Sequence, residues 1–196
     1  ILVVHPSLPA KSVKALIALA KARPGELNYG TSGVGSSVHI AAELFKSLTG
    51  ADIVRVNYKG ASRALTDLMA GQVHLMFAVP GSAMPHVKSG RLTALAVTSA
   101  EPSPLAPGLP PVAAAVPGYE SVSYLAIFAP VGTPPAIVSR LSQEIARALQ
   151  RPEVKEKFLS TSIETVGSSP EELASKLKSE IARMGKLIRD AGIRAD

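Results

Sequence analysis

Residues 29–39 read YGTSGVGSSVH and join a short apolar stretch, Leu27–Gly30, to a helical stretch that begins near Ser37. Three glycines and four hydroxyl residues lie in this stretch: Gly30, Gly33, Gly35, Thr31, Ser32, Ser36 and Ser37. Open α/β sheets bind their ligands in loops of this kind, between the carboxyl end of a strand and the start of a helix. The stretch therefore predicts both an α/β fold and the position of a ligand loop.

The chemistry of this loop favours an anion. The first backbone N–H groups of a helix have no partner inside the helix, and they lie at the positive end of its dipole. Gly33 and Gly35 let a ligand approach the backbone closely, and the hydroxyl groups donate or accept hydrogen bonds. Such a loop can bind a carboxylate or a phosphate without Lys or Arg. The alternative is a tight turn whose serines only cap the helix, but the glycines and hydroxyls exceed what capping requires.

Two nucleotide-binding motifs fit this loop less well. Gly30 and Gly35 have the glycine spacing of a P-loop, but Ser36 stands where the lysine should be. Gly33 and Gly35 begin a dinucleotide fingerprint whose third glycine is replaced by Val38. A nucleotide- or phosphate-binding enzyme that uses the same loop is therefore the second hypothesis.

Two further stretches follow apolar segments that read as strands. Asn57-Tyr58-Lys59-Gly60 comes after Ile53–Tyr58, and Phe77–Gly81 comes after Val73–Phe77. Tyr58 offers its ring as a wall and its hydroxyl as a donor, and the second stretch is placed to line the same crevice. The alternative in both cases is an ordinary turn.

The order of apolar segments divides the chain into two parts. Residues 1–118 alternate strands and helices, which predicts a mostly parallel sheet covered on both faces. Residues 119–129 are β-rich and long enough to carry the chain from one structural unit to another. The remainder is helical, and Ser169–Glu172 form a capping box. These last helices carry apolar stripes, but no sheet of their own is present in this chain.

Composition excludes several classes of function. The 196 residues are 46% hydrophobic with a net charge of +6, yet the basic residues are dispersed and Trp is absent, which disfavours nucleic-acid binding. The absence of cysteine excludes disulfides, thiolate catalysis and cysteine zinc sites. The four histidines show no HxH or HExxH spacing, and no serine lies in G-x-S-x-G. We therefore expect no metal, no cofactor and no catalytic residue.

The sequence resembles a known family over its whole length. The runs that carry the resemblance are YGTSGVGSSVHIAAELFKSLTG, VNYKGASRALTDLMAGQVHLMF, GRLTALAVTS, PGYESVSYLAIFAPVGTPPAIVSRL and EELASKLKSEIARMGKLIRDAGI. They are similar to the substrate-binding proteins of tripartite tricarboxylate transporters, the periplasmic Bug-type receptors. The resemblance implies a periplasmic, type II Venus-flytrap binding protein of two domains. It would bind a small carboxylate between the domains and deliver it to a membrane permease.

The resemblance also implies a ligand site. By their match to the family, Thr31, Ser32, Gly33, Gly35, Ser36 and Ser37 form the ligand loop of the second domain. Tyr58 matches the tyrosine of the family motif P-Y-K-G, although Asn57 replaces the proline. Ala78 stands where many members have an acidic residue after the strand. This departure implies a preference for a different ligand.

The same resemblance implies a domain assignment. Residues 1–118 would be the complete second domain, 119–129 the hinge and crossing strand, and 130–196 the C-terminal helical part of the first domain. The sheet of that first domain, with a further ligand loop, lies in a family region that precedes residue 1, so we expect either that the natural N-terminus lies upstream or that the chain is extensively processed. The apolar stripes of the C-terminal helices would then be exposed and would favour self-association or packing against a partner.

Overall fold

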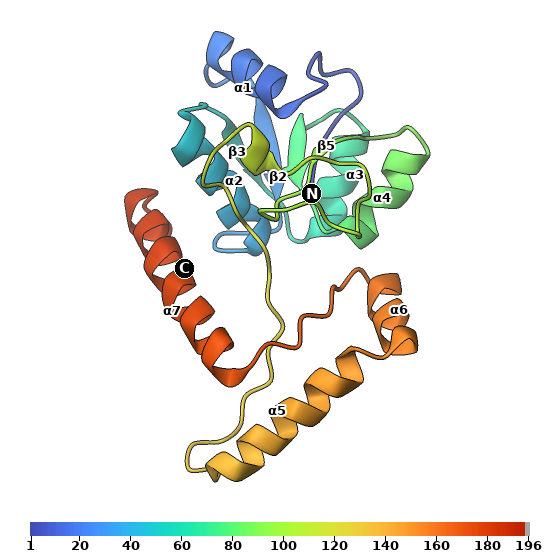
Figure 1. Cartoon of the computed structure of the whole chain (residues 1–196). Coiled ribbons are helices and arrows are strands. Elements are labelled where there is room, and N and C mark those ends of the chain that lie inside the picture. The colour runs from blue at the N-terminus through green and yellow to red at the C-terminus, as the bar shows by residue number, and fades with distance from the viewer. Residues whose placement is uncertain (195–196) are drawn as a thin grey trace. The chain divides into compact units, whose positions relative to one another are not determined.

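The computed structural model describes residues 1–194 and shows two compact units (Figure 1). Unit 1 consists of Ile1–Ser123 together with the end of the chain from Leu187, and unit 2 is Tyr124–Lys186. The boundary at Tyr124 falls within the segment 119–129 that we expect to cross between domains. The assignment of the two units to the domains of a receptor stays a prediction.

Unit 1 is built on one five-stranded sheet. Its strands are β1 (Leu2–Val4), β2 (Asn28–Thr31), β3 (Val54–Asn57), β4 (Leu75–Phe77) and β5 (Thr93–Ala96), in the order β3-β2-β4-β1-β5. Strand β2 is parallel to β3 and β4, whereas β1 is antiparallel to β4 and β5. The prediction of a mostly parallel sheet is therefore confirmed, because β2, β3, β4 and β5 share one direction, whereas β1 runs the other way. A buried apolar strand has the same pattern in both directions, so the sequence does not reveal its orientation.

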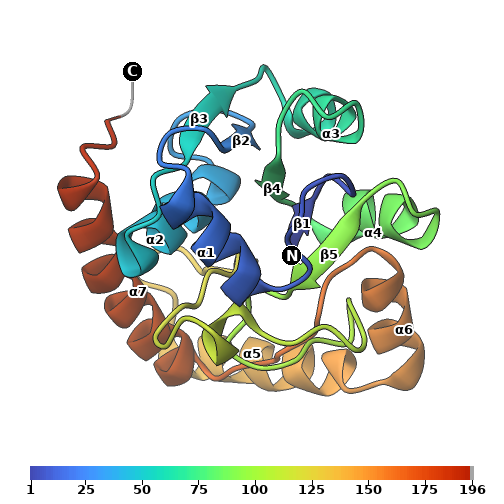
Figure 2. The same cartoon turned by 90° about the horizontal axis from the view of Figure 1, so that it is seen from above.

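Helices cover both faces of this sheet, as predicted. They are α1 (Val13–Ala22), α2 (Ser37–Thr49), α3 (Ala61–Met69) and α4 (Pro80–Lys88), with a 3₁₀ turn, η1, at Val112–Ala114. Figure 2 shows α1 and α2 on one face and α3 and α4 on the other. The chain moves from β2 to β3 and then back across β2 to β4, and right-handed crossovers in opposite directions place α2 and α3 on opposite faces.

An aromatic cluster fixes α2 to the sheet. The ring centroid of Phe45 lies 5.8 Å from that of Phe77 and 6.3 Å from that of Tyr119, and all three residues are buried. The hydroxyl of Tyr119 donates a hydrogen bond to the carbonyl oxygen of Ala41 at 3.1 Å. The helix that follows the ligand loop is therefore anchored by both apolar packing and a buried hydrogen bond.

Unit 2 contains α5 (Pro135–Leu149), α6 (Pro152–Ser160) and most of α7 (Pro170–Asp190). The predicted capping box is confirmed, since Ser169 N–H donates to Glu172 Oε2 at 2.8 Å and Glu172 N–H donates to Ser169 Oγ at 3.1 Å. The β-rich segment 119–129 forms no strand within the described residues. A single backbone bond in the described part of the chain, from Ser121 N–H to the carbonyl oxygen of Thr98 at 2.8 Å, joins this segment to the neighbourhood of β5, and one bond does not make a strand ladder.

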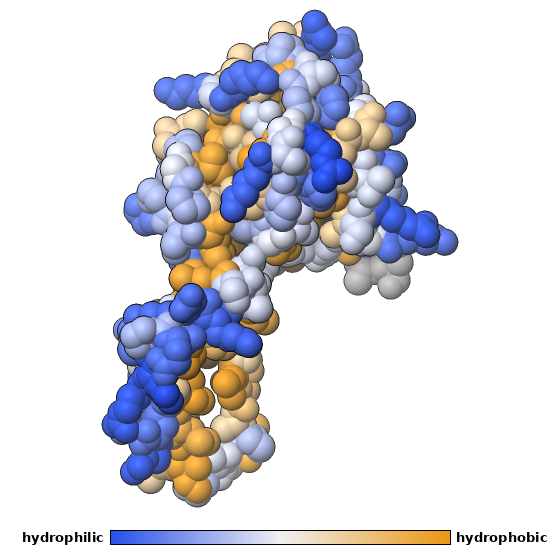
Figure 3. Space-filling view, turned by 90° about the vertical axis from the view of Figure 1, so that its right-hand side faces the viewer, coloured by the Kyte–Doolittle hydropathy of each residue, from blue (hydrophilic) through white to orange (hydrophobic). Residues whose placement is uncertain are grey.

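Unit 2 exposes its apolar side chains, and Figure 3 shows hydrophobic patches on its surface. Leu125 is 81% exposed and Phe128 is 69% exposed, while α5 and α6 contain no buried residue. Other large apolar side chains that are at least half exposed are Ile127, Val131, Ile137, Leu141, Val166 and Ile181. The predicted exposure is thus confirmed for Ile137 and Leu141 of α5 and for Ile181 and Ile188 of α7, whereas the other members of the two stripes are half-buried. Among the described helices, none combines the length and the apolarity needed to cross a bilayer.

We expect Phe45→Ala to lower the free energy of unfolding by about 3–5 kcal/mol, because it leaves a cavity between Phe77 and Tyr119. Urea unfolding followed by circular dichroism measures this loss. Leu48→Ala is the matched control, because Leu48 lies on the same helix but is 44% exposed. It should cost less than about 1 kcal/mol. Equal losses for the two variants would contradict the anchoring role of the aromatic cluster.

Candidate functional site

Three parallel strands end at one edge of the sheet, and each is followed by the start of a helix. Strand β2 leads into α2, β3 into α3 and β4 into α4, and β2 lies between the other two. None of the three helices has an acidic residue in its first turn. The positive ends of three helix dipoles therefore lie at the same edge without a competing carboxylate in those turns.

The backbone of the ligand loop is held from inside by its own hydroxyl groups. The carbonyl oxygen of Gly33 accepts hydrogen bonds from Ser36 Oγ at 2.9 Å and from Thr31 Oγ1 at 3.3 Å. Gly33 and Gly35 have φ values of +130° and +74°, a region that other residues adopt only with strain. Thr31 is fully buried. The structure thus places the hydroxyls of Thr31 and Ser36 where they brace the loop.

Several amides of this loop have no hydrogen-bond partner within the described residues. They are the N–H groups of Ser32, Gly33, Val34, Ser37 and Val38. The amide of Gly35 is occupied, since it donates to Nδ1 of His39 at 3.0 Å. In the same part of the chain, the hydroxyls of Ser32 and Ser37 have no partner either, and Ser37 is exposed. The loop therefore presents several neutral donors and no formal charge.

The structure places Tyr58 beside the loop. Its N–H donates to the carbonyl oxygen of Thr31 at 2.9 Å, and its ring lies 3.5 Å from the point where a side chain on Gly30 would begin. Burial and the nearby carboxylate of Asp67 raise the pKa of Tyr58, so its hydroxyl faces α3 and stays protonated at neutral pH. Its role as a wall of the site stays a prediction. A pocket of about 400 Å³ begins there, lined by Tyr58, Ser62, Arg63, Thr66 and Asp67.

Ala78 lies at the same sheet edge. Tyr29 of β2 is opposite Leu75 of the parallel strand β4. Ser32 and Ala78 each come three residues later in the chain, so they reach equivalent positions at this edge. Ala78 is buried, and its N–H donates to the carbonyl oxygen of Ile1 at 2.8 Å. It offers the site an apolar surface, and its effect on ligand preference stays a prediction.

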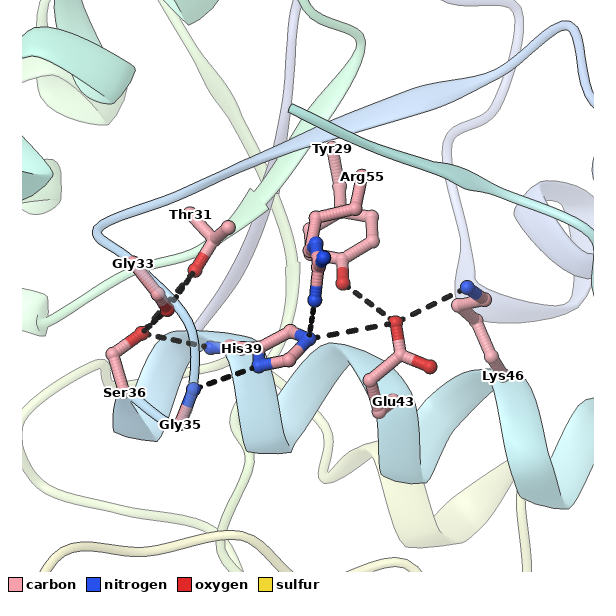
Figure 4. A network of polar contacts seen from close by, with 9 residues as sticks. All are labelled: Tyr29, Thr31, Gly33, Gly35, Ser36, His39, Glu43, Lys46 and Arg55. Carbon is pink, nitrogen blue, oxygen red and sulfur yellow. Dashed lines mark hydrogen bonds and ion pairs between the residues drawn. The ribbon is translucent and has the colours of Figure 1, made fainter. Parts of the chain in front are cut away.

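A polar network behind the loop was not predicted from the sequence (Figure 4). Nε2 of the fully buried His39 lies 2.8 Å from Nη1 of Arg55 and 3.9 Å from Oε1 of Glu43. The same oxygen of Glu43 accepts from Tyr29 Oη at 2.6 Å and from Lys46 Nζ at 3.1 Å. The sequence contains one signal for it, because the spacing of His39 and Glu43 places them on one face of a helix.

Burial sets the charge state of this network. It lowers the pKa of His39, and the neighbouring guanidinium of Arg55 lowers it further, so the imidazole is neutral at pH 7. Burial and the hydrogen bond to Glu43 raise the pKa of Tyr29, whose phenol therefore stays protonated. A pocket of about 500 Å³ adjoins the network, and its lining includes Val34, Lys46 and Arg55. Within residues 1–194, no three His, Cys, Asp or Glu side chains are placed to hold a metal ion.

Comparison with known proteins gives the family. A family model described as "Tripartite tricarboxylate transporter family receptor" matches residues 1–193. The chain is 35% identical to the UPF0065 protein in the tcbD-tcbE intergenic region of Pseudomonas sp. strain P51, over 100% of this chain and 59% of that protein. It is also 35% identical to BugT of Bordetella pertussis, over 98% of this chain and 59% of BugT. The chain thus spans about three fifths of the length of these relatives.

Solved structures agree with this match. R. palustris Rpa4515 with adipate has a TM-score of 0.81 and 41% identity, over 98% of this chain and 64% of that one. MatC (Rpa3494) from Rhodopseudomonas palustris with bound malate has a TM-score of 0.70 and 26% identity, over 95% of this chain and 65% of that one. The periplasmic binding protein BugD has a TM-score of 0.73 and 25% identity, over 100% of this chain and 66% of that one. The chain belongs to the receptor family of the tripartite tricarboxylate transporters, which includes the Bug proteins.

Proposed function

We propose that these residues are part of a periplasmic receptor that binds a small carboxylate and delivers it to the membrane permease of a tripartite tricarboxylate transporter. The receptor has no catalytic activity and uses no cofactor. The observation that carries the proposal is the set of free amides at the start of α2, on Gly33, Val34, Ser37 and Val38. Adipate and malate, the molecules bound in two structures of relatives, are both dicarboxylates.

The carboxylate oxygens accept hydrogen bonds from these amides. Hydrogen bonds to a charged group contribute about 1.5–3 kcal/mol each, and the dipoles of α2, α3 and α4 add to the attraction. The hydroxyls of Ser32 and Ser37 provide further donors. The ring of Tyr58 and the methyl group of Ala78 border the site and restrict the shape of the bound acid.

A receptor of this kind closes two domains around its ligand. In this proposal residues 1–118 form one complete domain, 119–129 form the hinge and crossing segment, and 130–196 belong to the other domain. The exposed apolar side chains of unit 2 support it, because such a surface is normally covered. The relatives are longer than this chain, which supports a covering sheet outside these residues. Self-association through the same surface is the alternative.

Two-domain closure predicts that the 196 residues by themselves bind weakly. We expect their dissociation constants for adipate, malate and citrate to be at least about tenfold higher than those of a receptor with the full length of the relatives, because the ligand contacts one domain only. Titration calorimetry on both proteins measures the difference. Equally tight binding by the 196 residues would refute the two-domain part of the proposal and leave the loop as the whole site.

Removing a single amide tests the loop itself. Ser37 is the first residue of α2, where proline is well tolerated, and Ser36 has φ −64° and ψ 157°, which suits a residue before proline. Ser37→Pro therefore deletes one free N–H and one hydroxyl without disturbing the helix. Ser37→Ala deletes only the hydroxyl and is the matched control.

In the protein of natural length, we expect Ser37→Pro to bind the preferred of these acids about 10- to 100-fold more weakly than Ser37→Ala. The free energy of unfolding of the two variants should agree within about 1 kcal/mol. Calorimetry and urea unfolding give the two quantities. Equal affinities for Ser37→Pro and Ser37→Ala would show that this amide does not touch the ligand.

The role of Tyr58 as a wall can be separated from a role as a donor. Because its hydroxyl faces the carboxylate of Asp67 on α3, we expect Tyr58→Phe to change the affinity by less than about threefold. Tyr58→Ala removes the ring and should weaken binding by about tenfold or more. A large loss in Tyr58→Phe would instead identify the hydroxyl as a ligand donor.

A further inference from the structure

One hydrogen bond fixes the middle of the ligand loop from behind. The amide of Gly35 donates to Nδ1 of His39 at 3.0 Å, and this amide lies in the sequence between the free amides of Val34 and Ser37. The N–H of His39 in turn donates to Ser36 Oγ at 3.3 Å. His39 is fully buried, so neither of its bonds is exchanged readily for water. The geometry of the free amides therefore depends on this ring (Figure 4).

We infer that His39 is a positioning residue for carboxylate binding, and that protonation of its imidazole releases the loop and lowers the affinity for the ligand. The inference rests on the proposed function, because it assumes that the loop binds a carboxylate. His39 does not touch the ligand in this account. It acts through Gly35.

Counting protons on the ring shows why protonation matters. A neutral imidazole has one N–H and one lone pair, and Gly35 requires the lone pair on Nδ1. Arg55, which can only donate, lies 2.8 Å from Nε2. In the other neutral tautomer the lone pair is on Nε2, and the ring then accepts from Arg55 instead of from Gly35. An imidazolium carries N–H groups on both nitrogens. It would face donors at both ends and would lose the bond to Gly35.

The charges around His39 place its titration in the acid range. The titratable and charged groups on the elements packed against it are Glu43 and Lys46 of α2, Arg55 of β3, Tyr29 of β2 and Arg194, which follows α7 and lines the same pocket. Only Glu43 favours the imidazolium, and its Oε1 is shared with Tyr29 and Lys46. Since the pKa of His39 is below its ordinary value, the affinity should be constant near neutral pH and fall only below about pH 6.5.

Two variants separate positioning from general stability. His39→Asn places a carbonyl oxygen near the position of Nδ1, so it can still accept from Gly35 but cannot be protonated. His39→Leu removes the acceptor. Calorimetry with adipate from pH 8 to pH 5, on the protein in its natural length, compares both variants with the wild type. Protonation of adipate affects all three proteins equally, so ratios of their affinities isolate the effect of His39.

At pH 8 we expect His39→Asn to bind adipate within about threefold of the wild type, and His39→Leu about three- to tenfold more weakly. As the pH falls below the ordinary pKa of an imidazole, the wild type should lose more affinity than His39→Asn, by a factor that levels off near the three- to tenfold loss of His39→Leu. Parallel pH profiles for the wild type and His39→Asn would overturn the inference. This comparison does not depend on whether His39→Leu folds.

A measurement without ligand tests the loop bond by itself. In ¹H–¹⁵N spectra of the unliganded protein, the amide signal of Gly35 should move with the protonation of His39 and be independent of pH in His39→Asn. If the chemical shift of the Gly35 amide does not change when His39 is protonated, the inference is overturned even if adipate binds. If that shift changes but adipate, malate and citrate fail to bind at any pH, the proposed function is wrong, and with it the role of His39 in carboxylate affinity.

Discussion

The parallel pairing of β2 with β3 and β4 is the constraint on which the site depends. It brings the carboxyl ends of three strands to one sheet edge, so that α2, α3 and α4 all begin there. The register is continued past the strands by the bond from Tyr58 N–H to the carbonyl oxygen of Thr31. With any other strand order the glycine-rich loop would be an isolated turn, and its amides would lack the two neighbouring helix dipoles.

Within the loop, the polar groups divide into those that hold the backbone and those that remain free. Thr31, Ser36 and His39 bond to the carbonyl of Gly33 or the amide of Gly35, and so fix a backbone that the two glycines would otherwise leave mobile. Thr31 and His39 are buried, so their bonds to the loop also give their own polar side-chain atoms a partner. The result is a neutral, preorganised set of donors, which loses little conformational entropy when an anion binds.

The sequence predicts the parts of this architecture that depend on neighbouring residues. The loop, the helix that starts at Ser37 and the capping box at Ser169 are local patterns, and all of them are present in the structure. The direction of β1 could not be predicted, because it depends on which strands it joins in the sheet. The contact of His39 with Arg55 also escaped prediction, since 16 positions separate the two residues and only the pairing of β2 with β3 brings them together.

A backbone site of this kind recognises a carboxylate but does little to distinguish one acid from another. In the proposed site the amides of Gly33, Val34, Ser37 and Val38 would contact only the charged end of a ligand, and every mono-, di- or tricarboxylate has such an end. Selectivity must therefore come from groups that meet the rest of the molecule. In the proposed site, the groups of unit 1 beside the free amides are the ring of Tyr58, the buried methyl group of Ala78 and the hydroxyls of Ser32 and Ser37. Tyr58 and Ala78 would favour an apolar carbon chain next to the bound carboxylate, whereas a hydroxyl on the ligand would need Ser32 or Ser37 to replace its hydrogen bonds to water.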